Sequence, residues 1–367
     1  MSSKMVLVHT GERHKNGFIL LFVMMVISLL SYLSITLMNY GMMAGATAKQ
    51  AYYKKQAQCL ALSGVSAAIG MLTQEKKESK EPQKDGKKQS NDASPIYNAL
   101  FALNKWYEFA LKQGSDGVDG TVAFYPTYEG GKINLNALYD FDKKEYSAVG
   151  KKVVPWLDEK LKKRSIAFKD LFDKAVKGRD QPLYDISDLL PSSSDGTSAI
   201  EKFFWVPVTL ANAKSGGSAP QKKESVFAIT DLFTVEQSAV KVEPIFASSS
   251  LGAMLGFSSG NAPADEAQKA KTLNKDELYK LVGGASIDWE SVWEKAVAPL
   301  VGKTYTELPQ SITELFSSEL GSRTFSVTSV GSYEGVQQTV TALLGYQEVQ
   351  EKDKMLRWFY IKKLYWL

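Results

Sequence analysis

The feature that most constrains this chain is a long uncharged apolar stretch near its amino terminus. Residues 16–48 contain no charged side chain, and the most apolar part is Phe18–Met38. A helix of about 20 residues rises about 30 Å, which matches the hydrocarbon core of a bilayer. Three basic residues precede it, and such residues are expected to remain cytoplasmic; they are Lys4, Arg13 and Lys15. The sequence therefore predicts a single membrane span at residues 18–40.

Three interpretations of this amino terminus compete. It is an uncleaved signal anchor, a cleaved secretory signal peptide, or a prepilin. The segment "AGATA" at 44–48 offers small residues for a signal peptidase, although the apolar run exceeds the usual length of 7–15 residues. A prepilin has a short basic leader ending in glycine, here "ERHKNG", followed by an apolar helix, here "FILLFVMMVISLL". Cleavage between Gly17 and Phe18 at the cytoplasmic face then leaves the helix as the anchor.

Helical character continues beyond the apolar stretch, through residues 41–73. This part is rich in Ala and Gln and contains no proline. Small and apolar residues recur in it at helical spacing, which indicates a stripe that a sheet or another helix can approach closely. The stripe consists of Ala57, Leu60, Gly64, Ala68 and Leu72. We expect Cys59 to be a small buried residue on this helix.

Composition excludes several classes of function. The net charge is only +4, and the leader supplies +2 of it (three basic residues minus Glu12), so no basic field indicates nucleic-acid binding. A single cysteine allows no internal disulfide. Both histidines, His9 and His14, precede the apolar run, so a chain cut after Gly17 has none. This excludes Ser-His and Cys-His nucleophile pairs and His-ligated zinc.

A membrane-anchored envelope enzyme is the main alternative from another functional class. Neither an H-E-x-x-H zinc motif nor a G-x-x-x-x-G-K-[ST] phosphate loop occurs. Chemistry based on carboxylates or lysine stays open, because two loop carboxylates can act as acid and base. No sequence feature supports such an activity directly, so we expect the chain not to be an enzyme.

Composition shifts divide the remainder of the chain. The charged, apolar-poor segments read as linkers or long loops. The predicted organisation is as follows: leader 1–17; transmembrane part of the long helix 18–40; periplasmic part of that helix 41–73; disordered linker 74–95; start of an α+β domain 96–147; inserted helical subdomain 148–200; strands of the α+β domain 201–257; linker 258–272; second helical segment 273–320; and a carboxyl-terminal β-meander 321–367.

Hydrophobic periodicity assigns the elements within these parts. Helices are predicted over 95–112, 148–190 and 274–320, and strands over 121–128, 203–211, 225–235, 323–330, 336–344 and 355–367, with a turn at 331–335. In "GGKINLNAL" (130–138) a Gly-Gly turn precedes alternating apolar residues, and Asn136 is positioned to cap a following helix. The last strand is apolar on both faces, which indicates cover by the long helix. Alternatively, Trp358, Tyr365 and Trp366 contact a partner.

These patterns predict an α+β fold with a pilin-like long N-terminal helix, packed on an antiparallel sheet, and a large inserted helical subdomain. At this point the chain resembles the K-type minor pseudopilins of type II secretion (the GspK family). The resemblance rests on the leader ending in Gly17, the helix opening from Phe18, and the string Gly131, Ile133, Asn134, Leu135 and Asn136. Other pilins and pseudopilins carry Glu at the fifth mature position, whereas the K type lacks it, and here that position is Phe22.

The resemblance implies a function as well as a fold. It implies a subunit at the tip of a periplasmic pseudopilus that helps to start its assembly, anchored once in the inner membrane of a Gram-negative bacterium with its carboxyl-terminal domain in the periplasm. Cleavage by prepilin peptidase and N-methylation of Phe18 are implied too. The implied partners are the I- and J-type minor pseudopilins and the inner-membrane assembly platform. A minor pilin of a type IV pilus is the nearest alternative.

Some members of that family bind calcium, so calcium is possible here, although no cofactor is required. Four loop acids supply oxygen atoms of the kind that calcium prefers: Asp116, Asp119, Asp140 and Asp142. Neither pair of acids matches an EF-hand loop. We therefore interpret these acids as solvated loop residues and assign no metal ligand.

Overall fold

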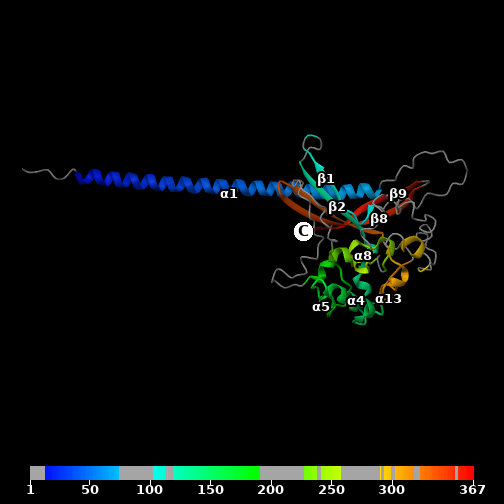
Figure 1. Cartoon of the computed structure of the whole chain (residues 1–367). Coiled ribbons are helices and arrows are strands. Elements are labelled where there is room, and N and C mark those ends of the chain that lie inside the picture. The colour runs from blue at the N-terminus through cyan, green and yellow to red at the C-terminus, as the bar shows by residue number, and fades with distance from the viewer. Residues whose placement is uncertain are drawn as a thin grey trace, which may run out of the picture. The chain divides into compact units, whose positions relative to one another are not determined.

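The computed structural model describes residues 13–73, 102–112, 114, 119–190, 227–237, 241–257, 290, 293–298, 302–317, 323–351 and 354–367. Figure 1 draws the whole chain. The chain divides into two compact units, Met1–Gln56 and Ala57–Leu367, and each is described by itself.

A single helix, α1, runs from Arg13 to Thr73 without interruption. Its carboxyl-terminal part, from Ala57 onward, belongs to the second unit and lies against a sheet (Figure 1). Small residues form the contact. A Cβ atom added to Gly64 would lie 2.1 Å from Oγ of Ser329, and one added to Gly331 would lie 2.2 Å from the carbonyl oxygen of Ala57. The predicted stripe of small residues is therefore the surface by which the helix approaches the sheet.

The sheet has five antiparallel strands in the order β1-β2-β7-β8-β9. Their bounds are β1 Tyr107–Leu111, β2 Gly120–Tyr128, β7 Thr324–Tyr333, β8 Val336–Glu351 and β9 Lys354–Trp366. The last three strands are the predicted meander. The turn between β7 and β8 is tighter than predicted: it consists of Glu334 and Gly335, with φ angles of 48° and 79°, and the residues before it belong to β7.

The helical part is inserted between β2 and β7, which are neighbours in the sheet although about 195 residues of chain separate them. Its described elements are η1 Glu129–Gly131, β3 Ile133–Asn134, η2 Leu135–Ala137, β4 Tyr139–Asp140, β5 Glu145–Tyr146, α4 Gly150–Lys162, α5 Phe168–Val176, η3 Ile186–Leu189, α7 Ile229–Leu232, β6 Phe233–Thr234, η4 Pro244–Phe246, α8 Ser249–Leu255, the π-helix η5 Trp293–Val297, η6 Tyr305–Glu307 and α13 Gln310–Thr313. The predicted fold class is confirmed.

Two hydrophobic cores hold the second unit together. One lies between α1 and the sheet and includes Ala61, Val65, Ala68, Leu72, Phe124, Val327, Val340, Ala342 and Leu344. The other fills the helical insertion and includes Ile133, Leu135, Leu138, Leu157, Leu161, Phe168, Phe172 and Leu232. The segment 129–138 leaves the sheet at the end of β2 and enters the second core, so it is the junction between the two layers.

Two predicted elements are wrong. Residues 107–111 form strand β1 and not the end of a helix, because Tyr107 and Phe109 both stack on Phe124 of the neighbouring strand; aromatic side chains pack well in such pairs. Residues 229–232 form a helical turn, α7, and not a strand, because Ile229 and Leu232 enter the core at a spacing of three. Only Phe233 and Thr234 continue as strand β6.

Three further expectations are corrected. Cys59 is exposed on α1, because its neighbours Ala57 and Leu60 face the sheet instead. Asn136 does not cap a helix; Asn134 caps η2, since its side chain accepts a hydrogen bond from the Asn136 amide. The last strand, β9, was expected to be covered by α1, and it is buried only in part. Phe359 packs into the helix–sheet core, but several side chains of β9 are more than one third exposed: Trp358, Tyr360, Ile361, Leu364 and Trp366.

Several predictions lie outside the described residues. These are the linkers at 74–95 and 258–272 and the strand at 203–211. Most of the second helical segment, 273–320, lies outside them as well. Its described part holds only the short helices η5, η6 and α13.

Candidate functional sites

The first candidate site is the apolar part of α1. Among the described residues, α1 is the one helix that is long and apolar enough to cross a membrane. Phe18 and Phe22 are 73% and 58% exposed. The hydroxyl groups of Ser28, Thr36 and Thr47 each donate to the carbonyl oxygen four residues earlier. These bonds satisfy three hydroxyl groups within the helix, and those of Ser28 and Thr36 lie in the part predicted to be in lipid, where polar groups need internal partners.

The predicted cleavage position lies within this helix, since Gly17 and Phe18 are consecutive residues of α1. Removal of residues 1–17 would leave Phe18 as the first residue of an intact helix. Cleavage between Gly17 and Phe18 and methylation of Phe18 stay predictions.

The second candidate site is the junction built by "INLN". The Asn136 side chain donates to the carbonyl oxygens of Leu183 (2.9 Å) and Val235 (3.2 Å) and accepts from the Leu183 amide (2.8 Å). The Asn134 side chain donates to the carbonyl oxygen of Glu236 (2.8 Å). Two asparagines thus join three segments that are far apart in the sequence. Their role in the structure is to hold the helical insertion together.

The other residues of the motif are determined by packing. Ile133 and Leu135 are fully buried in the core of the insertion. A Cβ atom at Gly131 would lie 1.9 Å from the carbonyl oxygen of Phe246, which is a backbone atom. Only glycine fits at this position, so the motif is a packing signature of the junction.

A buried ion pair adjoins this motif, and sequence reasoning missed it. The Lys132 ammonium group donates to Oε1 of Glu129 (2.5 Å), to Oγ of Ser326 (2.9 Å) and to the carbonyl oxygen of Thr230 (3.0 Å). The Thr234 hydroxyl donates to the second carboxylate oxygen of Glu129. Both charged residues are 4% exposed or less. The sequence signal of this pair is the i, i+3 spacing of the two charges around Gly-Gly, at the end of an apolar strand.

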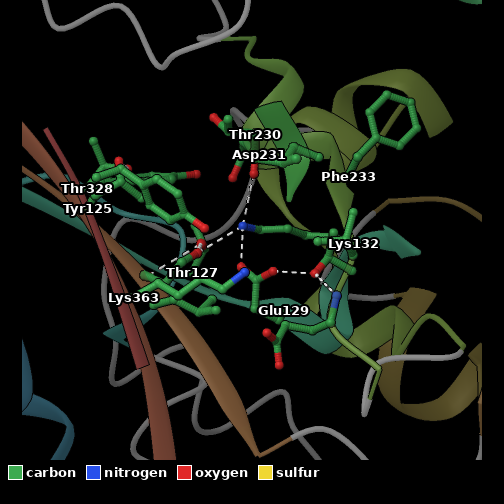
Figure 2. A pocket seen from close by; sticks show the side chains of 17 residues that line it. Tyr125, Thr127, Glu129, Lys132, Thr230, Asp231, Phe233, Thr328 and Lys363 are labelled. Carbon is green, nitrogen blue, oxygen red and sulfur yellow. Dashed lines mark hydrogen bonds and ion pairs between the residues drawn. The ribbon is translucent and has the colours of Figure 1, made fainter. Parts of the chain in front are cut away.

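A small cavity lies beside this ion pair, between the sheet and the helical insertion (Figure 2). Its volume is about 60 Å³. Asp231 lines it and is 4% exposed. Oδ2 of Asp231 accepts from the Ser250 amide (2.9 Å), whereas Oδ1 is buried and has no hydrogen-bond partner in the described part of the chain. Burial raises the pKa of the Asp231 carboxyl group above its ordinary value.

Of the loop acids considered for calcium, Asp119, Asp140 and Asp142 lie in the described part of the chain, and none of them belongs to a group placed to hold a metal ion. Asp140 accepts a hydrogen bond from the Lys143 amide and forms an ion pair with the Lys143 ammonium group. Asp116 lies outside the described residues. Within the ranges that the structure describes, no group of three or more His, Cys, Asp or Glu side chains is placed to hold a metal ion.

The aromatic residues of β9 divide between two environments. The Tyr365 hydroxyl donates to Oδ2 of Asp185 (2.6 Å), in the segment before η3. Trp358 and Trp366 are 38% and 43% exposed at the edge of the sheet. Tyr365 therefore has a structural role, whereas contact of the two tryptophans with a partner stays a prediction.

One serine has the spacing of a hydrolase nucleophile. Residues 256–260 read Gly-Phe-Ser-Ser-Gly, which fits G-x-S-x-G. That motif requires a strand before the serine and a helix after it. Here Gly256 instead ends helix α8 in a left-handed conformation, and Ser258 lies outside the described residues. A helix therefore precedes this motif, at the place where a nucleophile elbow has a strand.

No protein-family model matches this chain, and no curated protein does. The search of solved structures finds a chain in the crystal structure of the GspK-GspI-GspJ complex from the enterotoxigenic Escherichia coli type 2 secretion system. The two chains are 14% identical, the match covers 87% of this chain and 99% of that chain, and the TM-score is 0.39. A likeness of this size does not by itself assign a function.

Proposed function

We propose that this chain is a K-type minor pseudopilin, located at the tip of the periplasmic pseudopilus of a type II secretion system. The observation on which the proposal rests is the composition of α1. Its first half is apolar and exposed, and its last turns form the core of an antiparallel α+β domain. One helix thus serves both as a membrane anchor and as part of the domain core.

Phe22 supports the position at the tip. In an assembly of parallel helices, a carboxylate at the fifth mature position would pair with the amino terminus of the subunit above. A carboxylate without such a partner is costly in lipid, where a charged residue costs several kcal/mol. A subunit with nothing above it is therefore better served by an apolar residue, as found here.

The helical insertion supports the same position. It is inserted between β2 and β7 and adds a second hydrophobic core to the sheet domain. A domain of this bulk would obstruct the stacking of a further subunit. Accordingly, we propose that the chain starts assembly with the I- and J-type minor pseudopilins, on the inner-membrane platform, after cleavage by prepilin peptidase. No enzymatic activity is proposed.

The mature amino terminus tests the class of protein. The full chain should be expressed with a prepilin peptidase, purified from membranes and analysed by mass spectrometry of its first peptide. We expect a chain that begins at N-methylated Phe18. Gly17→Val should block this processing, whereas Gly41→Val, on the same helix with no atom near its Cβ position, should leave it unchanged. A chain that begins at Met1 indicates a plain anchor, and one that begins after residue 48 indicates a secretory signal.

The partners separate the two pilin-like alternatives. Crosslinks from the processed chain to two smaller pseudopilins of a secretion system would support the proposal. Crosslinks to pilins of a type IV pilus would replace it with the minor-pilin alternative.

A further inference from the structure

The positive charge of this chain is concentrated in two helices of the insertion. Helices α4 and α5 pack against each other (Figure 1). Residues 150–177, which contain both helices, have nine basic and four acidic side chains. Their net charge of +5 exceeds the +4 of the whole chain, so all other residues together carry −1. This pair of helices is therefore the basic surface of the protein.

Neighbouring carboxylates match only part of this charge. Four of the nine basic side chains are paired, among them Lys162 with Asp158 (2.8 Å) and Lys169 with Asp173 (2.9 Å). The other five form no ion pair and no hydrogen bond within the part of the chain that the structure describes; they are Lys160, Lys163, Arg164, Lys174 and Lys177. Only two acids of the same range, Glu159 and Asp170, are unpaired there, so an excess of unpaired positive charge faces the solvent.

Arg164 is held in place more firmly than the lysines. Its Cζ atom lies 3.9 Å from the centre of the Phe227 ring, and that ring is 4% exposed. The amides of Arg164 and Ile166 both donate to the carbonyl oxygen of Leu161 (2.8 and 3.1 Å), which fixes the turn that carries the side chain. The N–H groups of the guanidinium group have no acceptor among the described residues, so they are available to a ligand.

The charge of Arg164 is half-buried without a carboxylate to compensate it. Burial lowers the pKa of the guanidinium group from its ordinary value, because the charged form loses hydration. The Phe227 ring offsets part of this cost through a cation–π contact. A carboxylate from another molecule would offset more of it, because it accepts two parallel hydrogen bonds from the planar guanidinium group.

Two lysines extend this site along the end of α4. Lys160 lies three residues before Lys163 and four before Arg164, and residues so spaced on a helix have Cβ atoms about 5–6 Å apart. Acidic residues on one face of a partner's helix have the same spacing. Both α4 and α5 are described throughout, and neither has a large apolar side chain among the exposed ones. The surface thus lacks the apolar residues with which a helix inserts into a lipid interface.

We propose that Lys160, Lys163 and Arg164 form a docking surface for an acidic segment of another protein, with a carboxylate of that segment bound to Arg164. The lysines attract the segment, and Arg164 supplies the directional hydrogen bonds. This surface belongs to the insertion alone, so the proposal does not depend on the processing of α1 or on the position of the chain in an assembly.

The test uses the full chain in phosphatidylcholine nanodiscs and a fluorescein-labelled oligoglutamate peptide, with binding measured by fluorescence anisotropy. We expect binding that weakens as the salt concentration rises. Arg164→Gln should weaken it about tenfold, which corresponds to the loss of one charge-assisted hydrogen bond. Lys152→Gln is the matched control. It removes the same charge from the same helix, but Lys152 is paired with Glu314 (2.6 Å), so the affinity should change less than about twofold.

Three results would overturn the proposal. The first is no binding of the peptide at low salt, and the second is an equal loss of affinity in Arg164→Gln and Lys152→Gln. The third is tighter binding to phosphatidylglycerol vesicles than to the peptide, lost in Arg164→Gln, which would make the surface a lipid site. If Arg164→Gln fails to fold, Arg164→Lys decides the matter, because it keeps the charge but loses the planar group. Weaker binding by Arg164→Lys supports the site, and an unchanged affinity refutes it.

Discussion

The contact between α1 and Gly331 allows a quantitative test of how helix and sheet approach each other. In Gly331→Ala, the new Cβ atom would lie 2.2 Å from the carbonyl oxygen of Ala57 and 2.5 Å from the amide nitrogen of Ala61. Ordinary contacts begin near 3.4 Å, so the helix backbone must move by about 1 Å. A gap of 0.5–1 Å forfeits a quarter to a half of the dispersion energy of each contact across it.

This displacement affects the core that Ala61, Val65, Ala68 and Leu72 form with the sheet. Overpacking of this kind costs about 1–3 kcal/mol, and the loss exceeds the gain of about 0.5–1 kcal/mol expected for Gly→Ala from chain entropy. We expect Gly331→Ala to lower the free energy of unfolding by about 1–3 kcal/mol. Urea denaturation followed by tryptophan fluorescence measures this change.

Gly70→Ala is the matched control. Gly70 lies on α1, the helix that Gly331 of β7 contacts, and no atom is within 4 Å of its Cβ position, so the substitution should stabilise the protein by up to about 1 kcal/mol. If Gly331→Ala is as stable as the unmodified chain, within about 0.5 kcal/mol, then helix and sheet do not approach as closely as described.

Three further predictions concern the junction and the last strand. Asn136→Ala removes three hydrogen bonds and should lower the free energy of unfolding by about 1–3 kcal/mol for each buried group left unpaired. Denaturation measures this loss, with the near-isosteric Asn136→Asp as the comparison. Lys132→Met leaves the Glu129 carboxylate buried without its partner and should lower the free energy of unfolding by about 3–5 kcal/mol. Adding Glu129→Gln should restore a large part of that loss, and a double variant as unstable as Lys132→Met would contradict the pairing. Burial raises the pKa of Asp185, but its hydrogen bonds, first among them that from Tyr365, outweigh burial, so the folded-state pKa lies below 3.8. The stability that results is present above pH 3.8 and is lost as the pH falls further. In acid denaturation, Tyr365→Phe should reduce that loss.

Local pattern was sufficient to predict α1 and the carboxyl-terminal meander. The apolar run and the small-residue stripe specify the helix over many turns, and alternation in β7 and β8 specifies their buried face. The tight turn before Val336 fixes the register. The prediction of a helix at 107–111 is wrong because aromatic residues occur in amphipathic helices as well as in strands, and only the pairing with Phe124 favours the strand.

The junction could be predicted only as a motif, not as a set of contacts. Asn136 bonds to Leu183 and Val235, which lie 47 and 99 residues away. Lys132 reaches Ser326 across 194 residues. No local pattern encodes such distances. The motif included Gly131, but the need for glycine there is visible only in the folded chain, where the backbone of Phe246 occupies the position of a Cβ atom.

The order of strands in the sheet has a consequence for biogenesis. β2 has β7 as its neighbour, and β7 to β9 come from the final residues of the chain. Pairings of such high sequence separation form slowly, because the intervening chain must close into a loop first. If the chain is exported as proposed, the face of α1 that packs on the sheet would therefore stay uncovered until β7 to β9 have crossed the membrane. A chaperone or a sibling helix that shields this face in the interim would prevent aggregation of the nascent subunit.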